Sequence, residues 1–216
     1  MNFEPSRAKA LDRLESFVEN NLAEYSKLRN FDFGPEKRSN VSCLSPYITH
    51  GIINEQEIIK KSLGKFSFSK NEKFIQEVLW RTYWKGWLEL RPNVWSDYLI
   101  ELNKIREEFK NNQNYFNAIE GKTNIKCFNV WVNELKENNY LHNHTRMWFA
   151  SIWIFTLELP WQLGAEFLCD ISMTATPRPI LLDGDGLLEF KHKENIIWRA
   201  NGTLKNSLLT GSITLN

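Results

Sequence analysis

Cysteine is scarce in this sequence, and its few copies are poorly placed for a structural role. The three cysteines among 216 residues are Cys43, Cys127 and Cys169, an odd number at wide spacings. Neither a disulfide framework nor the usual spacing of metal ligands can be built from them. A reducing cytoplasm is therefore the expected location.

A strong charge excess and a long apolar run are also missing. The formal net charge is +1, so any binding of nucleic acid must depend on a local basic patch. The longest apolar stretch, Trp148 to Leu157, is too short to cross a bilayer and is followed by Glu158. The N-terminal residues 1–15 are charged and amphipathic, unlike a signal peptide. We expect no association with a membrane.

Helical periodicity dominates what the sequence does contain. In residues 7–25, apolar side chains recur at the spacing of one helix face. No alternating strand pattern of useful length precedes residue 170, so the expected fold class is all-α. With Pro92 and Pro160 as stops, the same period predicts further helices over residues 46–62, 71–90, 96–109, 113–119, 126–138 and 143–158.

The most informative segment is a polar cluster, HNHTR at residues 142–146, that opens an aromatic helix. Asn and Arg at a helix start can hydrogen-bond a flat polar ligand, and the apolar turns behind them hold them in place. A capped core helix explains the aromatic residues equally well, since Trp and Phe often only pack. His142 and His144 have no third ligand placed by the sequence, so no metal site is predicted.

Three further segments place polar groups next to apolar helices. Residues 42–47, SCLSPY, form a small turn whose hydroxyls and backbone N–H groups suit an anion. Residues 74–84, FIQEVLWRTYW, predict an aromatic helix carrying Glu77 and Arg81 one turn apart. An exposed pair between these two, worth only about 0.2–0.5 kcal/mol, is the alternative explanation. Residues 120–123, EGKT, form a turn before another amphipathic helix.

In this order, the four segments resemble the FAD-binding helical domain of the DNA photolyase/cryptochrome family. The family shows T-S-R-L-S-P-Y, E-x-x-W-R-x-x-Y/W, E-G-x-T and H-N-R-x-R-M, and the resemblance runs from about Phe3 to about Phe167. It implies an all-α domain over residues 1–170 with FAD as cofactor. The family's N-terminal α/β antenna domain has no counterpart, so we expect a stand-alone short form without a second chromophore.

The resemblance implies a set of cofactor contacts and one central cavity bordered jointly by Ser45, Arg81 and Asn143. A helix-end aromatic is an equal explanation for one of the contacts, Tyr25. The set is Tyr25, Ser42, Leu44, Ser45, Phe74, Arg81, Asn143 and Arg146. Val41 replaces the family's usual threonine and Cys43 its usual arginine, so the phosphates lose a hydroxyl and a guanidinium. FAD is therefore expected to bind less tightly.

A second set is implied in the reaction itself: Glu77, Trp80, Asn143, Met147 and Trp161. All but Trp161 would face the DNA lesion, and Trp161 matches one member of the tryptophan chain that photoreduces the flavin. The outer partner of that chain would fall near residues 105–110, which contain Phe109 but no Trp. His144 stands where lesion-repairing members have arginine, which puts lesion recognition in doubt.

The activity implied is light-driven repair of pyrimidine dimers, by electron transfer from reduced FAD to a flipped-out dimer. An active chain would be a carbon–carbon lyase that works as a monomer on damaged DNA. The missing antenna domain, His144 and the incomplete tryptophan chain favour an alternative, a flavin blue-light sensor without repair activity. An inactive truncated product is the third reading.

The resemblance stops after Phe167. The family continues with an acidic D-G-D segment that holds the flavin ring, followed by W-x-W. Asp183-Gly184-Asp185 lies too late in the chain to be that segment. Residues 171–216 are therefore expected to form a non-homologous, poorly ordered tail that exposes apolar surface.

A shifted reading frame explains the break. Taking the third base of each codon with the first two of the next gives aspartate at Met173-Thr174 and permits D-G-D there. That is the register expected from Asn143. We hypothesise a frameshift near Phe167–Leu168, which resequencing of those codons tests.

Overall fold

The computed structural model describes residues 3–174. Within that range the chain forms helices, turns and loops and no strand, so the predicted all-α fold is confirmed. The elements are α1 (Arg7–Asn20), η1 (Leu22–Glu24), α2 (Tyr25–Leu28), α3 (Ser45–Thr49), α4 (Glu55–Lys65), α5 (Phe68–Glu89), α6 (Pro92–Phe109), α7 (Gln113–Glu120), α8 (Lys126–Asn138), α9 (Asn143–Ser151), η2 (Ile152–Thr156) and α10 (Trp161–Ile171).

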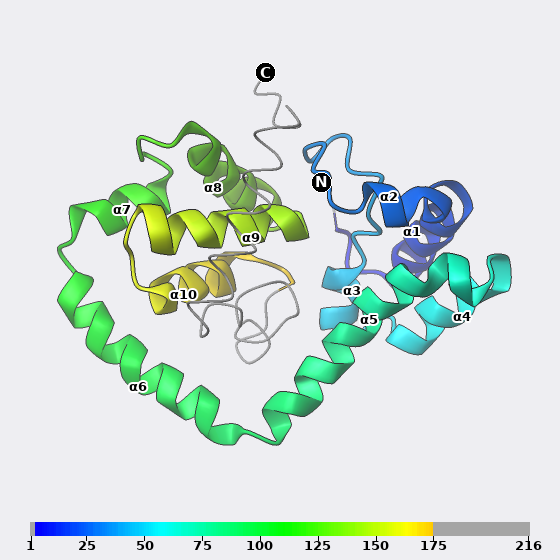
Figure 1. The fold of residues 1–216 in the computed structure, drawn as a ribbon, viewed down its shortest axis with the longest axis horizontal. Helices are drawn as coiled ribbons and strands as arrows, with labels where there is room; N and C mark the ends of the chain where they lie inside the picture. Colours follow the sequence, from blue (N-terminus) through cyan, green and yellow to red (C-terminus); the bar gives the residue numbers. More distant parts are fainter. Residues whose placement is uncertain (1–2, 175–216) are drawn as a thin grey trace.

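The helices are arranged in two halves joined by two long arms. Figure 1 shows α1 to α4 on one side, α7 to α10 on the other, and the successive helices α5 and α6 running between them. Among residues 3–174, no helix is long and apolar enough to span a membrane.

The predicted helix over residues 46–62 is wrong, because two helices, α3 and α4, occupy this range. The break falls at Gly51, whose φ of +67° is left-handed and cannot continue an α-helix. Asn54 then starts α4 through a capping box: its side chain accepts from the Glu57 N–H, and the Glu57 carboxylate accepts from the Asn54 N–H. Apolar periodicity persists across the break because both helices bury one face.

Three other predicted helices also differ from the structure. The predicted helix over residues 7–25 is divided at Asn21 into α1, η1 and α2. Pro92 lies in the first turn of α6, where a backbone N–H would have no acceptor within the helix, so proline is tolerated there. Helix α6 therefore begins before the predicted residue 96. The predicted helix over residues 143–158 ends as α9 at Ser151 and continues as a π-helical turn, η2.

Helix α10 was not predicted. Its sequence, WQLGAEFLCDI, is mostly apolar, and the polar residues Glu166 and Asp170 lie one turn apart on its less buried side. It returns against η2, where the Trp153 indole N–H donates to the Pro160 carbonyl at 2.9 Å. A Cβ at Gly164 of α10 would lie 3.0 Å from the Trp153 ring, so the two elements pack closely there.

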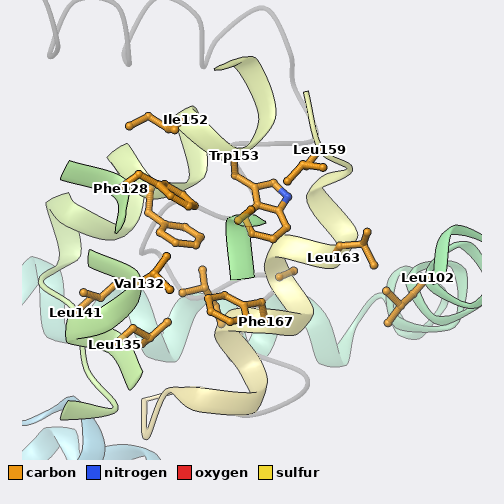
Figure 2. Packing of buried hydrophobic residues seen from close by; sticks show 14 of the residues in the cluster. Leu102, Phe128, Val132, Leu135, Leu141, Ile152, Trp153, Leu159, Leu163 and Phe167 are labelled. Atoms are coloured by element: carbon orange, nitrogen blue, oxygen red, sulfur yellow. The ribbon is translucent and has the colours of Figure 1, made fainter. Parts of the chain in front are cut away.

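Each half has its own aromatic core. In the α7–α10 half, Phe128 stacks on Phe149 with ring centroids 4.6 Å apart, and Trp153 lies 6.2 Å from Phe167. Figure 2 shows Phe128, Trp153 and Phe167 within this cluster. In the other half, α1, α2 and α5 contribute to a second core that includes Phe17, Tyr25 and Phe74. The loop after α2 and the start of α9 lie between the two cores.

Candidate cofactor site

One cavity lies where the two halves meet. Its walls come from α2, the turn at residues 41–45, α5 and the start of α9. Ser45, Arg81 and Asn143 border it jointly, as predicted, and its volume is about 140 Å³. All the residues predicted to contact the cofactor line it: Tyr25, Ser42, Leu44, Ser45, Phe74, Arg81, Asn143 and Arg146.

The turn at residues 41–45 presents its two serines to the cavity because of the backbone at Cys43. Cys43 has φ of +51°, which is uncommon for a residue other than glycine and bends the turn sharply. Its side chain is buried, and that burial raises the pKa of the thiol, so a neutral group stands where the family usually has arginine. Ser42 and Ser45 stay half-buried at the cavity wall.

Helix α5 contributes one continuous face. Phe74 and Arg81 are buried, Glu77 is half-buried, and Trp80 lies at the rim with 47% of its surface exposed. Glu77 accepts from Arg29 at 2.5 Å, and the Arg81 guanidinium donates to the Thr49 hydroxyl at 2.7 Å. Both contacts join α5 to other parts of the chain, so Glu77 and Arg81 are more than an exposed pair within one helix.

The polar cluster 142–146 combines capping with lining of the cavity. His142 caps α9, its Nδ1 accepting from the His144 N–H at 3.2 Å. Asn143 and Arg146 follow on the cavity side, and Arg146 donates to the Thr174 hydroxyl at 3.0 Å. The aromatic residues behind them, Phe149 among them, pack in the core. Within this segment Asn143 and Arg146 therefore line the cavity, whereas the aromatic residues pack in the core.

A buried ionic cluster ties the halves together beside the cavity. The Arg38 guanidinium lies 2.6 Å from the Asp32 carboxylate and 2.7 Å from that of Glu134 on α8. Thr145 of α9 donates to Asp32 as well. Burial acts to raise the pKa of Asp32, but Arg38 and Thr145 outweigh it and hold that pKa below its usual value. For Glu134 burial prevails over Arg38, and the pKa is raised.

Both histidines at the cavity are held neutral. Burial lowers the pKa of His142 to about 4, against the attraction of Asp32, and burial also lowers the pKa of His144. His144 Nε2 lies 2.8 Å from Asn30 Oδ1, so the ring is tied to the loop that follows α2. Within the described residues, no group of three or more His, Cys, Asp or Glu side chains could hold a metal ion.

Two of the residues predicted to act in the reaction lie outside the cavity lining. Met147 follows Arg146 on α9 without bordering the cavity, and Trp161 packs at the start of α10 against Tyr98 with ring centroids 5.6 Å apart. Their assignments stay predictions. Residues that were left out of the predicted set also line the cavity or contact it: Arg29, Tyr140, His142, His144, Thr49 and Thr174.

The donor set fits a flavin dinucleotide. Guanidinium groups of Arg81 and Arg146 and hydroxyls of Ser42 and Ser45 can bind a diphosphate. Phe74 supplies apolar wall for a flat ring system. The buried polar atoms at the cavity without a hydrogen-bond partner among residues 3–174 include Asn143 Oδ1, His142 Nε2 and His144 Nδ1. Such atoms are costly to leave unpaired, so a polar ligand is the expected partner.

Comparison with known proteins agrees with this geometry. Residues 74–177 match the family described as the FAD binding domain of DNA photolyase. Over these residues the chain resembles a photolyase-type FAD-binding domain. The family match confirms the predicted resemblance and the predicted cofactor, FAD.

Individual relatives of this photolyase-type domain are similar over most of the chain. A deoxyribodipyrimidine photo-lyase of Buchnera aphidicola (subspecies Acyrthosiphon pisum) is 30% identical over 173 residues, which are 76% of this chain and 35% of the relative. One of Vibrio cholerae is 24% identical over 172 residues, 77% of this chain and 35% of the relative. The chain thus spans about a third of the length of the curated relatives it matches.

Solved structures share the fold. A cryptochrome of Synechocystis superposes with a TM-score of 0.71 at 19% identity, covering 86% of this chain and 40% of that one. A class III photolyase of Agrobacterium tumefaciens gives 0.68 at 24% identity, covering 84% and 37%. At these identities the likeness establishes the helical fold alone.

Proposed function

We propose that this photolyase-type domain binds FAD in the cavity between its two halves. The observation that carries the proposal is that Arg81, Arg146, two serine hydroxyls and the unpartnered Asn143 oxygen all border one cavity. Ser42, Ser45 and the two arginines would bind the diphosphate, and Asn143 would accept from an N–H of the ring. A helix N-terminus behind Asn143 adds a favourable partial charge for an anion.

Admitting a whole dinucleotide requires lining side chains to move outwards. Ligand pockets commonly measure roughly 300–1,000 Å³, and the cavity measures about 140 Å³. The Arg29–Glu77 pair is the part best able to give way, since its side chains keep 26% and 31% of their surface exposed. A partly exposed ion pair costs less to break than a fully buried one, so this pair can open more easily than the buried lining can move.

We propose further that the bound flavin serves light-driven repair of pyrimidine dimers in DNA. Reduced FAD would supply the electron once excited by blue light. The chain's part is to hold a flipped-out base at the rim: Trp80 offers an exposed ring for stacking, and Glu77 offers a carboxylate beside it. Acting this way, the chain would be a monomeric carbon–carbon lyase in the cytoplasm with damaged DNA as its partner.

The binding proposal is tested with the purified full chain. We expect flavin fluorescence titration to show saturable FAD binding, weakened at least ten-fold by Arg81→Met, because a charged hydrogen bond contributes about 1.5–3 kcal/mol. Lys85→Met is the matched control, since Lys85 is an exposed cation one turn further along α5. Equal affinities of the two variants, or no binding by the unaltered chain, would refute it.

A blue-light sensor without repair activity is the second candidate, and His144 favours it. Where lesion-repairing members carry arginine, this chain places a neutral ring against Asn30. Oligonucleotides containing pyrimidine dimers, mixed with the flavin-loaded chain under blue light, separate the two. Restored bases establish repair, whereas flavin bleaching with intact dimers favours the sensor. A chain that binds no flavin at all would be the inactive product.

A further inference from the structure

Two threonines from distant parts of the chain form a hydrogen-bonded bridge across the cavity wall. Arg81 donates to the Thr49 hydroxyl at 2.7 Å, and that hydroxyl donates to the Thr174 carbonyl at 3.2 Å. On the far side, Arg146 donates to the Thr174 hydroxyl at 3.0 Å. The bridge therefore joins an arginine of α5 to an arginine of α9, in opposite halves of the molecule.

The hydroxyl of Thr49 has its proton direction fixed. The Thr49 oxygen accepts from a guanidinium and donates its single proton to the Thr174 carbonyl. The Thr174 oxygen accepts from Arg146 and lies 2.8 Å from the Ser172 oxygen, in a contact where either hydroxyl can donate. The Ser172 oxygen also accepts from the Thr174 N–H at 3.2 Å.

The segment that carries Thr174 is held firmly after the end of α10. Thr174 keeps 2% of its surface exposed and Ser172 9%. The Met173 N–H donates to the Asn139 carbonyl at 2.9 Å, and the Asn139 side chain donates to the Ile171 carbonyl at 2.9 Å. The Thr174 hydroxyl therefore cannot turn away without breaking several contacts.

We propose that Thr49 and Thr174 are positioning residues that fix Arg81 and Arg146 for the FAD diphosphate and couple the two arginines to one another. Long guanidinium side chains lose up to about 2 kcal/mol of rotamer entropy when they are ordered on a ligand. A side chain already held by a hydroxyl has lost part of that freedom before binding. The inference rests on the proposed binding of FAD.

The test compares FAD affinity in Thr49→Val, Thr174→Val and Thr174→Ser, with thermal unfolding as a check on folding. We expect each valine variant to bind FAD about two- to thirteen-fold more weakly, the range of one neutral hydrogen bond. Thr174→Ser keeps the hydroxyl and should rescue affinity to within two-fold. Thr82→Val, at an exposed threonine next to Arg81, is the matched control and should bind as the unaltered chain does.

The double variant reports coupling. If the bridge acts as one unit, Thr49→Val together with Thr174→Val weakens binding by much less than the product of the single effects. A purely structural role for the threonines would lower the melting temperature and leave affinity unchanged, which would overturn the proposal. Affinities of both valine variants equal to that of Thr82→Val would overturn it too.

A measurement without ligand separates this inference from the proposed function. In the ligand-free chain, nitrogen-15 relaxation of the arginine Nε–H groups should show increased motion of Arg81 in Thr49→Val and of Arg146 in Thr174→Val, because each substitution removes the hydroxyl to which that arginine donates. If the unaltered chain binds no FAD, the proposed function fails, and this readout alone decides whether the threonines hold the arginines. Unchanged motion of both arginines would then refute the positioning role.

Discussion

Arg38 shows how much a single buried charge can matter in this protein. Its guanidinium side chain is completely shielded from solvent, between Asp32 and Glu134. Arg38→Met leaves two buried carboxylates without their cation, which should cost about 3–5 kcal/mol of unfolding free energy. Urea unfolding measures this loss.

The matched control for Arg38→Met is Lys27→Met. Lys27 pairs with Glu24 on the surface, with 74% and 56% of the side chains exposed, and such pairs contribute about 0–1 kcal/mol. A loss of the same size in both variants would mean that the buried cluster contributes no more than a surface ion pair.

His142 makes stability depend on pH in a defined direction. Burial lowers its pKa to about 4, from 6.5, so the folded state binds fewer protons than the unfolded state between these values. Stability is therefore lost as pH falls through that window, by about 2 kcal/mol between pH 7.5 and pH 5. The raised pKa of Glu134 has the opposite effect on stability as pH falls. Glu134 is unchanged in the variant described next, so its effect cancels in the comparison.

The variant that isolates this effect is His142→Asn. Asparagine keeps a side-chain oxygen to cap α9 but does not titrate. Its unfolding free energy should fall less than that of the unaltered chain over the same pH range. Parallel curves for the two proteins would exclude His142 as the source.

At the scale of elements, the contact between α10 and η2 depends on one glycine. A methyl group at position 164 would lie 3.0 Å from two atoms of the Trp153 indole, whose N–H is fixed on Pro160. Gly164→Ala should therefore destabilise the fold by about 1–3 kcal/mol through overpacking. Gly86→Ala is the control: it lies within α5 with no atom near a new methyl group, and should gain up to about 1 kcal/mol. Thermal unfolding of both variants decides whether Gly164 is needed.

Element boundaries show where sequence periodicity succeeds and fails. The ranges predicted for α5, α7 and α8 nearly match the structure, because each helix buries one face and exposes the other. The division at Gly51 was missed because a glycine within an apolar pattern is also compatible with a continuous helix. Tertiary packing selects its left-handed conformation. Helix α10 was missed because its 11 residues are mostly apolar, and a short apolar run does not by itself distinguish a helix from a strand.

At the scale of the molecule, the two halves are joined covalently only through α5 and α6. Leu90, between these helices, keeps 81% of its surface exposed. We expect thermolysin to cut there early, since it cleaves before exposed leucines. The two fragments should nevertheless elute together, because the Arg38 cluster and the Thr49–Thr174 bridge connect the halves. Separation of the fragments on gel filtration under native conditions would show that these contacts are too weak.

The division of the chain into residues 1–170 and 171–216 stays a proposal, as does the frameshift. Residues 171–174 belong to the described part, where Ser172 and Thr174 are buried against the cavity wall. The rest of the predicted tail lies outside the described residues. Two bases of the Thr174 codon belong to the aspartate of the shifted frame, and in the chain as written the Thr174 hydroxyl accepts from Arg146.

The sequence by itself determined the helical class, the family resemblance and the side chains that border the cavity, because these depend on local periodicity and on residue types at fixed spacings. Ser45, Arg81 and Asn143 were identifiable in this way. Only the tertiary structure decided their partners. Glu77 pairs with Arg29, Arg81 donates to Thr49, and Thr174 contacts both halves. These contacts join residues far apart in the chain, so they arise from packing and leave no periodic pattern in the sequence.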